Sequence, residues 1–405
     1  MPIDIERARR DTPAASQVLH FNNAGAALVP APVLQAQLRH LQLEAETGGY
    51  EAAAAAGDRI EAIYDSIARL LNAGRAEIAL VENATVAWDM AFYSIGFAAG
   101  DRILTAEAEY ASNYIAFLQV ARRSGAVVDV VPSDEAGELD VEALERMIDR
   151  RVKLIAITHV PTNGGLVNPA AAIGRIARAH GILYLLDACQ SVGQMPIDVA
   201  AIGCDMLSST GRKYLRGPRG TGFLYVRRAV LDRLEPPFLD LQAATWVEPD
   251  RYEMRPDARR FENWERNVAG QLGLGAAVDY ALGWGLADIA GRIEPLAAEL
   301  RRQLAAIPGV SVCDRGRRRC GIVTFTVEGK PARDIVAALR QRRINCHSSG
   351  PSVLVARARR LPDLVRASVH YYNTEEEVAR FAAAVAALAA PPRLLDRPER
   401  SPASS

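Results

Sequence analysis

The sequence predicts an α/β protein that has a mostly parallel sheet in a large domain and a smaller α/β domain at its C-terminal end. Continuously apolar runs such as KLIAITHV (153–160) and ILYLLD (182–187) alternate with amphipathic stretches such as AAIGRIARAHG (171–181). Strands of this kind are typical of parallel sheets that helices cover on both faces. A second, looser alternation beyond residue 284 predicts the smaller domain.

The predicted elements of the large domain follow one another closely. Two helices (32–46 and 58–72) precede an apolar strand near 78–81, a polar turn and a helix that begins after Asn83, a residue type that caps helix N-termini. Further strands are predicted at 101–107, 126–132, 153–160, 182–187, 205–210 and 222–226. The helices between them are predicted at 114–125, 141–149 and 171–181. No internal repeat is present.

The small domain begins with a long helical stretch (286–307) that Pro295 interrupts. A strand at 321–329, a helix at 332–343, a strand at 364–372 and a helix at 375–390 follow. We therefore expect an N-terminal arm (1–15) that forms part of the small domain, a large domain (16–283) and a small domain (284–390). Residues 391–405 are polar and rich in proline, which predicts a disordered tail.

Composition excludes several classes of protein. The 405 residues include 48 basic and 48 acidic side chains, so no net charge draws the chain to nucleic acid or to a membrane surface. We expect no signal peptide and no membrane-spanning helix, because the apolar runs are too short. The five cysteines form no CxxC pair, which predicts reduced thiols and a cytoplasmic location. The six histidines are scattered, so no metal site is predicted.

Polar side chains follow the predicted strands at the point where each strand ends. In open α/β sheets ligands bind at the carboxyl ends of the strands. Asn83, Ala84 and Thr85 lie there at a helix N-terminus, which favours an anion. Asp187 follows five apolar residues, and a carboxylate in that place needs a cationic or hydrogen-bonding partner. The other polar residues at strand ends are Tyr110, Asn113, Asn163, Gln190, Thr210, Arg212 and Lys213.

Each of these residues alone has an ordinary structural explanation, such as a helix cap or a solvated surface charge. Together they predict a pocket with an anion cradle, a buried carboxylate and one lysine. Other chemistries fit less well, because the sequence has no GxGxxG after a strand, no GxxxxGK[ST] phosphate loop, no HExxH and no GxSxG.

The segment LLDACQSVGQMPIDVAAIGCDMLSSTGRKYLRGPRGTGFLYV resembles the signature of the class V aminotransferases, the cysteine desulfurase-like group of pyridoxal 5'-phosphate (PLP) enzymes of fold type I. The resemblance extends from FNNAGAAL to HYYNTEEEV and implies the PLP-dependent transferase fold, with a seven-stranded type of sheet. It implies that Lys213 forms the Schiff base with the cofactor and that Asp187 pairs with the pyridine nitrogen. The implied cofactor-binding set is Ala84, Thr85, Tyr110, Asn163, Asp187, Gln190, Thr210, Arg212 and Lys213.

The resemblance also implies a substrate site and an assembly. Arg366 matches the arginine that holds the substrate carboxylate, and a guanidinium can grip a carboxylate through two hydrogen bonds. Asn23, Ala24 and Gly25 are the other implied substrate-binding residues. Sites of this fold lie at a dimer interface, so we expect a homodimer in which Trp264 or a neighbour lies near the other subunit's cofactor. The expected partner is a small amino-acid substrate.

The sequence departs from the desulfurases at three places. The loop at 350–360, where those enzymes have a sulfur-accepting cysteine, contains none, and Cys346 is interpreted as a core or pocket-wall residue. Arg212 stands where desulfurases have histidine, and Trp264 stands where they have a Gly-Thr pair. The segment ERNVAG looks more like the branch that contains isopenicillin N epimerase-like proteins and hercynylcysteine sulfoxide lyases.

These departures favour a carbon–sulfur β-lyase that converts a cysteine conjugate or sulfoxide into pyruvate and ammonia. The alternatives are a class V aminotransferase, an amino-acid epimerase and a cysteine desulfurase that lacks the loop cysteine. A non-catalytic binding protein with the same fold is disfavoured, because Lys213 and Asp187 are both intact.

Overall fold

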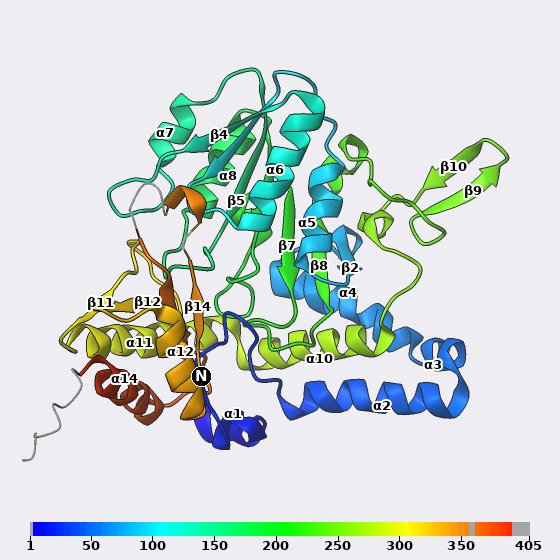
Figure 1. The fold of residues 1–405 in the computed structure, drawn as a ribbon. Coiled ribbons are helices and arrows are strands. Elements are labelled where there is room, and N and C mark those ends of the chain that lie inside the picture. The colour runs from blue at the N-terminus through cyan, green and yellow to red at the C-terminus, as the bar shows by residue number, and fades with distance from the viewer. Residues whose placement is uncertain (1–2, 351, 356–360, 391–405) are drawn as a thin grey trace, which may run out of the picture.

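The computed structural model describes residues 3–350, 352–355 and 361–390. The predicted disordered tail (391–405) therefore lies outside the described residues. Figure 1 shows a twisted sheet flanked by helices, with the helices and strands of the C-terminal part beside it at the lower left. No helix in the described part of the chain is both long enough and apolar enough to cross a bilayer.

The central sheet has seven strands in the order β2-β8-β7-β6-β5-β3-β4. Strands β3 to β7 are parallel to one another. β8 is antiparallel to both of its neighbours, β7 and β2, so the edge strand β2 runs in the same direction as β3 to β7. The reversed direction of β8 is a feature that the apolar pattern alone did not predict. The strands are β2 (Ile78–Val81), β3 (Arg102–Ala106), β4 (Val127–Val131), β5 (Val152–Thr158), β6 (Leu183–Asp187), β7 (Met206–Thr210) and β8 (Gly222–Val226).

Helices cover both faces of this sheet. Alternate residues of β5 and β6 enter two separate apolar clusters, because successive side chains of a strand point to opposite faces. One face packs against α5 (Ala84–Tyr93) and α6 (Ala111–Ser124). The other packs against α4 (Gly57–Leu71), α8 (Ala170–Ala179) and α10 (Val268–Trp284). The remaining helices of this part are α2 (Ala31–Thr47), α3 (Gly49–Ala55), α7 (Val141–Arg146) and α9 (Val199–Ile202).

The C-terminal part has an antiparallel sheet of four strands in the order β11-β12-β15-β14. These strands are β11 (Val310–Val312), β12 (Ile322–Val327), β14 (His347–Ser349) and β15 (Leu364–Ser368). The helices are α11 (Leu286–Ala305), α12 (Ala332–Gln341) and α14 (Glu375–Ala389). α11 continues through Pro295, where the sequence predicts an interruption, because burial of Ile293, Leu296 and Leu300 offsets the missing backbone hydrogen bond.

The N-terminal segment joins the C-terminal part. β1 (Leu19–His20) pairs in parallel with β13 (Ile344–Asn345). Arg9, at the end of α1 (Ile5–Arg10), donates a hydrogen bond of 2.8 Å to Glu377 of α14. A projecting hairpin of β9 (Ala244–Glu248) and β10 (Arg251–Met254) extends from the large domain at the upper right of Figure 1.

Candidate active site

Side chains at the carboxyl ends of β3, β5, β6 and β7 enclose a cavity of about 380 Å³. We call this the inner cavity. It brings together every predicted cofactor-binding residue except Asn163. Its lining residues are Asn83, Ala84, Thr85, Val86, Tyr110, Thr158, Val160, Thr162, Asp187, Cys189, Gln190, Thr210, Arg212 and Lys213.

One wall of the inner cavity is the N-terminus of helix α5. Asn83 caps this helix, and its side chain accepts a hydrogen bond of 3.0 Å from the backbone N–H of Val86. A Cβ at Gly222 of β8 would lie 2.8 Å from the backbone carbonyl carbon of Asn83, so glycine is needed for strand and helix to approach this closely. The N–H groups of the first helical turn, Thr85, Thr210 and Arg212 together provide donors for an anion such as a phosphate.

Asp187 occupies the end of β6 and is 5 % exposed. Its Oδ1 accepts a hydrogen bond of 2.9 Å from the backbone N–H of Cys189, and its Oδ2 accepts one of 3.0 Å from the side-chain amide of Asn113. Both partners donate, one hydrogen bond to each oxygen of the carboxylate. The carboxylate is thus held in place and can face a protonated nitrogen in the cavity.

Lys213 follows β7 and is buried in the cavity wall. Among the described residues its ammonium group has no hydrogen-bond or ion-pair partner. Burial lowers its pKa, and Arg212 and Arg366 add to the decrease, whereas Cys189 and Asp187 oppose it. The neutral amine, which is the nucleophilic form, is therefore favoured. The chain turns sharply after the lysine, where the N–H of Gly217 donates to the carbonyl of Gly211 at 2.7 Å.

Arg366 lies in β15 of the C-terminal part and is 4 % exposed. It donates hydrogen bonds of 3.0 Å to the carbonyl and the hydroxyl of Thr162 and one of 3.3 Å to Oδ1 of Asn22. None of the residues that the structure describes forms an ion pair with it, and its Nε has no hydrogen-bond partner. Burial lowers its pKa to about 10. A buried cation without a carboxylate is costly, so this site favours an anionic ligand.

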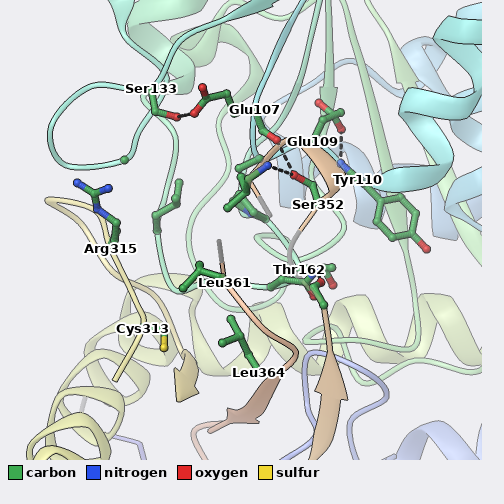
Figure 2. Close-up of a pocket in the computed structure, with 18 of the residues that line it drawn as sticks. Glu107, Glu109, Tyr110, Ser133, Thr162, Cys313, Arg315, Ser352, Leu361 and Leu364 are labelled. Atoms are coloured by element: carbon green, nitrogen blue, oxygen red, sulfur yellow. Dashed lines mark hydrogen bonds between the residues drawn. The ribbon is translucent and has the colours of Figure 1, made fainter. Parts of the chain in front are cut away.

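A second chamber of about 350 Å³ shares the walls formed by Tyr110 and Thr162 with the inner cavity. We call it the outer chamber. Figure 2 shows Arg315 and Cys313 on one side of this chamber and Tyr110 on the other, with Leu361 and Leu364 between them. The guanidinium of Arg315 donates to the backbone carbonyl of Glu135. The outer chamber thus lies between the loops of the large sheet and the C-terminal part of the chain.

Several predicted residues lie away from the inner cavity. Asn163 lines the outer chamber, where its side chain accepts a hydrogen bond of 2.6 Å from Ser349 and donates to the carbonyl of Gly350. Asn23 is buried, and its amide donates to the carbonyl of Ser368 at 2.7 Å. Ala24 donates its N–H to the Ser368 hydroxyl at 2.9 Å, and the carbonyl of Gly25 accepts from Arg212. These contacts join the N-terminal loop to β15 and to the lysine segment.

Two further residues of the sequence analysis, Cys346 and Trp264, do not line the inner cavity. Cys346 is buried, lies between β13 and β14 in the chain, and does not line either chamber. Trp264 is 55 % exposed and lies in a separate surface hollow with Tyr50 and Arg266.

Sequence reasoning missed Thr162, Cys189 and Glu109 and gave no role to Asn113. Thr162 precedes the predicted Asn163 by one residue, and its contacts with Arg366 come from a strand about two hundred residues later in the chain. Cys189 lies within the DACQ motif, which could have drawn attention to it. Glu109 and Asn113 are four residues apart at a helix start, a spacing that puts them on one face.

Comparisons with known proteins agree with this geometry. The profile of the aminotransferase class-V family matches residues 19–381. A probable cysteine desulfurase of Methanothermobacter thermautotrophicus is 32 % identical over 381 residues, which cover 92 % of this chain and 95 % of the relative. The apo structure of a cysteine desulfurase from Thermococcus onnurineus superposes with a TM-score of 0.89 at 28 % identity and covers 96 % of this chain and 98 % of that one.

A cystine C–S lyase in complex with its product, cysteine persulfide, superposes with a TM-score of 0.84 at 25 % identity. The match covers 93 % of this chain and 99 % of that structure.

The inner cavity fits the cofactor of this family. The buried Oε1 of Gln190 has no hydrogen-bond partner in the structure, and Lys213 has none among the described residues. Both lie in the same cavity as the anion-binding helix end and the Asp187 carboxylate, and a phosphorylated pyridine aldehyde matches this set of donors and acceptors. The chain belongs to the aminotransferase class-V family and is a PLP-dependent enzyme with the fold type I architecture.

Proposed function

We propose that the protein is a carbon–sulfur β-lyase that releases pyruvate and ammonia from S-substituted cysteines or their sulfoxides. The observation that carries this proposal is the outer chamber. Thr162 lines both chambers and also binds Arg366, so an amino acid whose carboxylate pairs with Arg366 has its side chain next to the outer chamber. A chamber of about 350 Å³ is far larger than a thiol requires.

The roles proposed for the chain follow from the described contacts. The N-terminus of α5, Thr210 and Arg212 hold the cofactor phosphate, Asp187 faces the pyridine nitrogen, and Lys213 carries the cofactor. Bound PLP supplies an electron sink for the bond that breaks at the substrate Cα. Arg366 fixes the substrate carboxylate and thereby orients the Cα–H bond. Lys213, once its amine is released and neutral, removes the Cα proton.

The overall reaction consumes one water. The proton leaves Cα, and the Cβ–S bond breaks so that its electron pair leaves with sulfur. The thiolate takes up a proton and departs as a thiol, or as a sulfenic acid when the substrate is a sulfoxide. The remaining three-carbon enamine is hydrolysed to pyruvate and ammonia. The reaction needs neither a keto acid nor a cysteine that accepts sulfur.

The loop sequence and two of the five cysteines support this assignment. Residues 350–360 contain no cysteine. Burial raises the pKa of the Cys346 thiol to about 12, and burial together with the charge of Asp187 raises the pKa of the Cys189 thiol further. A thiol that stays protonated at neutral pH is a poor nucleophile toward sulfur. The cystine C–S lyase, which shares this fold at 25 % identity, also cleaves a carbon–sulfur bond, and this supports the proposal.

A cysteine desulfurase is the second candidate, because the curated relatives at 30 % identity or more carry that name. Product analysis separates the candidates. The holoenzyme is incubated with L-cysteine, S-propyl-L-cysteine and its sulfoxide, each with and without 2-oxoglutarate. We expect equal amounts of pyruvate and ammonia from the S-propyl substrates without the keto acid.

Each alternative gives a different result in that experiment. Turnover that requires 2-oxoglutarate identifies an aminotransferase, and loss of stereochemistry without cleavage identifies an epimerase. Alanine and an enzyme persulfide from L-cysteine identify a desulfurase. Any of these three results in place of pyruvate contradicts the proposal.

We also infer a cytoplasmic homodimer. Leu34, Leu38 and Leu41 are about half exposed and lie on one face of α2, and Phe238 is 72 % exposed. Exposed apolar residues that gather on one face support contact with another protein surface. No disulfide joins the five cysteines, all of which lie in the described part of the chain, and this supports a reducing compartment.

A further inference from the structure

Glu109 is a buried carboxylate to which the proposed reaction gives no role. It is 4 % exposed and follows β3 at the same edge of the sheet as Asp187. It accepts hydrogen bonds from the backbone N–H groups of Tyr110 (2.8 Å) and Thr158 (3.0 Å), from the hydroxyls of Thr158 and Thr105, and from the side-chain amide of Asn113 (2.9 Å). Five donors therefore surround one carboxylate.

Asn113 links this carboxylate to Asp187. Its amide nitrogen carries two hydrogens, and it donates one bond of 2.9 Å to Glu109 and one of 3.0 Å to Asp187. The two carboxylates fix which way the amide points, because the carbonyl oxygen of the amide would be repelled at either place. Asn113 lies in the first turn of α6 and is 3 % exposed, so its position is fixed by a packed helix.

The donors around Glu109 favour its ionised form. The two backbone N–H groups and the amide nitrogen of Asn113 can only donate. A protonated carboxyl has an O–H group in place of one acceptor site, so it could not accept all of these hydrogen bonds. Burial acts in the opposite direction and raises the pKa of Glu109 to about 7, and the charge of Asp187 adds to the rise. Asp187 on β6 is the charged group that acts on Glu109, and the Asn113 amide joins the two carboxylates.

We propose that Glu109 is a positioning residue for Asp187 that acts through Asn113. It holds the Asn113 amide nitrogen toward Oδ2 of Asp187, so that Asp187 keeps one orientation. Its negative charge also strengthens the field that keeps a proton on the cofactor nitrogen which Asp187 is proposed to face. The inference rests on that proposed role of Asp187, and it is independent of which substrate bond breaks.

The test is the protonation state of the cofactor nitrogen, measured by ¹⁵N NMR on holoenzyme reconstituted with PLP labelled at the pyridine nitrogen. In Glu109→Gln we expect the pKa of that nitrogen to fall by about one unit, since removing one nearby charge changes a partly buried equilibrium by about tenfold. We also expect kcat for S-propyl-L-cysteine to fall about tenfold while KM changes less than about threefold. A purely structural role would leave the nitrogen resonance unchanged.

Glu107→Gln is the matched control. This variant makes the same change two residues earlier in the chain. The Glu107 side chain accepts one hydrogen bond, from Ser133, and none from Asn113. We expect its nitrogen resonance to match that of the unaltered enzyme. If Glu109→Gln also matches it, or if both variants move the resonance equally, the inference is wrong.

Asn113→Ala provides a second route, in case Glu109→Gln does not fold. This variant keeps both carboxylates but removes the amide that joins them. We expect the pKa of the cofactor nitrogen to fall, as in Glu109→Gln. In the double variant Glu109→Gln/Asn113→Ala, the pKa of the cofactor nitrogen should fall no further than in the more affected single variant, because both substitutions break the same link to Asp187. A folded Asn113→Ala enzyme with an unchanged resonance overturns the inference.

If Asp187→Asn itself leaves the resonance unchanged, the proposed role of Asp187 fails, and the inference fails with it. Product analysis tests the lyase proposal separately.

Discussion

The guanidinium of Arg366 donates two hydrogen bonds of 3.0 Å to Thr162, one to its carbonyl oxygen and one to its hydroxyl. The two residues come from different parts of the fold, because Arg366 lies in the small antiparallel sheet and Thr162 follows β5 of the large sheet. Thr162 also separates the inner cavity from the outer chamber. The contact therefore places a buried cation at the point where a substrate would bridge the two chambers.

Replacement of Arg366 tests this arrangement. Arg366→Lys keeps the charge but loses the planar fork that can bind a carboxylate through two parallel bonds. We expect kcat/KM for S-propyl-L-cysteine to fall by about a hundredfold, with most of the change in KM. Steady-state kinetics measures this, and the control is Arg333→Lys, which lies on the exposed surface of α12. Equal kcat/KM values for the two variants would show that Arg366 does not bind the substrate.

Lys213 should carry the cofactor. Borohydride reduction of the holoenzyme, followed by peptide mapping, should place the cofactor label on Lys213, because burial favours its neutral amine. The other lysines, Lys153 and Lys330, serve as internal controls. A label on either of them would contradict the assignment, and Lys213→Ala should carry no label.

Asp187→Asn should retain the fold and much of the cofactor but lose most of its activity. A neutral amide accepts the bonds from Cys189 and Asn113 poorly and cannot hold a proton on the pyridine nitrogen. We expect a loss of about 3 kcal/mol in transition-state stabilisation, which corresponds to a hundredfold decrease in rate. The measurement is kcat/KM on cofactor-saturated enzyme, with circular dichroism as a check on folding. Activity within a few-fold of the unaltered enzyme would remove Asp187 from the proposed site.

The assembly prediction concerns the apolar face of α2. Leu34, Leu38 and Leu41 lie outward on this helix, so Leu38→Glu should weaken a dimer by adding a charge to the contact. Sedimentation velocity should show a dimer for the unaltered chain and a lower fraction of dimer for the variant. Leu118→Glu is the control, since Leu118 is similarly exposed on α6. A fully active monomer at working concentration would contradict the homodimer.

Much of the fold can be predicted from the pattern of apolar residues in the sequence. The strands β5 and β6 and the helix α8 between them are recognisable because each strand is buried and largely apolar on both faces and the helix on one. The hydrophobic pattern could not show that β8 runs antiparallel to β7, because a buried strand has the same apolar pattern in either direction. It could not show the β9–β10 hairpin either, since four of the five β9 residues are exposed and the strand lacks a buried face.

The site was predictable to the extent that it is built from strand ends. Lys213, Asp187 and the α5 N-terminus each follow a strand of one sheet, and such residues converge on one edge. The position of Asn163 could not be derived in this way, because its side chain bonds to Ser349 and Gly350 of the other sheet's loop. The same limit applies to Glu109, whose link to Asp187 depends on the rotation of α6 against the sheet.

The most direct test of the central claim is the stoichiometry of products from S-propyl-L-cysteine, measured without keto acid or added reductant on the unaltered enzyme and on Cys346→Ala. The proposal predicts pyruvate, ammonia and propanethiol in equal amounts from both proteins, with no persulfide on any of the five cysteines by mass spectrometry. A propyl disulfide on Cys346 with alanine in place of pyruvate, and loss of sulfur release in Cys346→Ala, would instead show that the enzyme passes sulfur through a cysteine and is not a simple β-lyase.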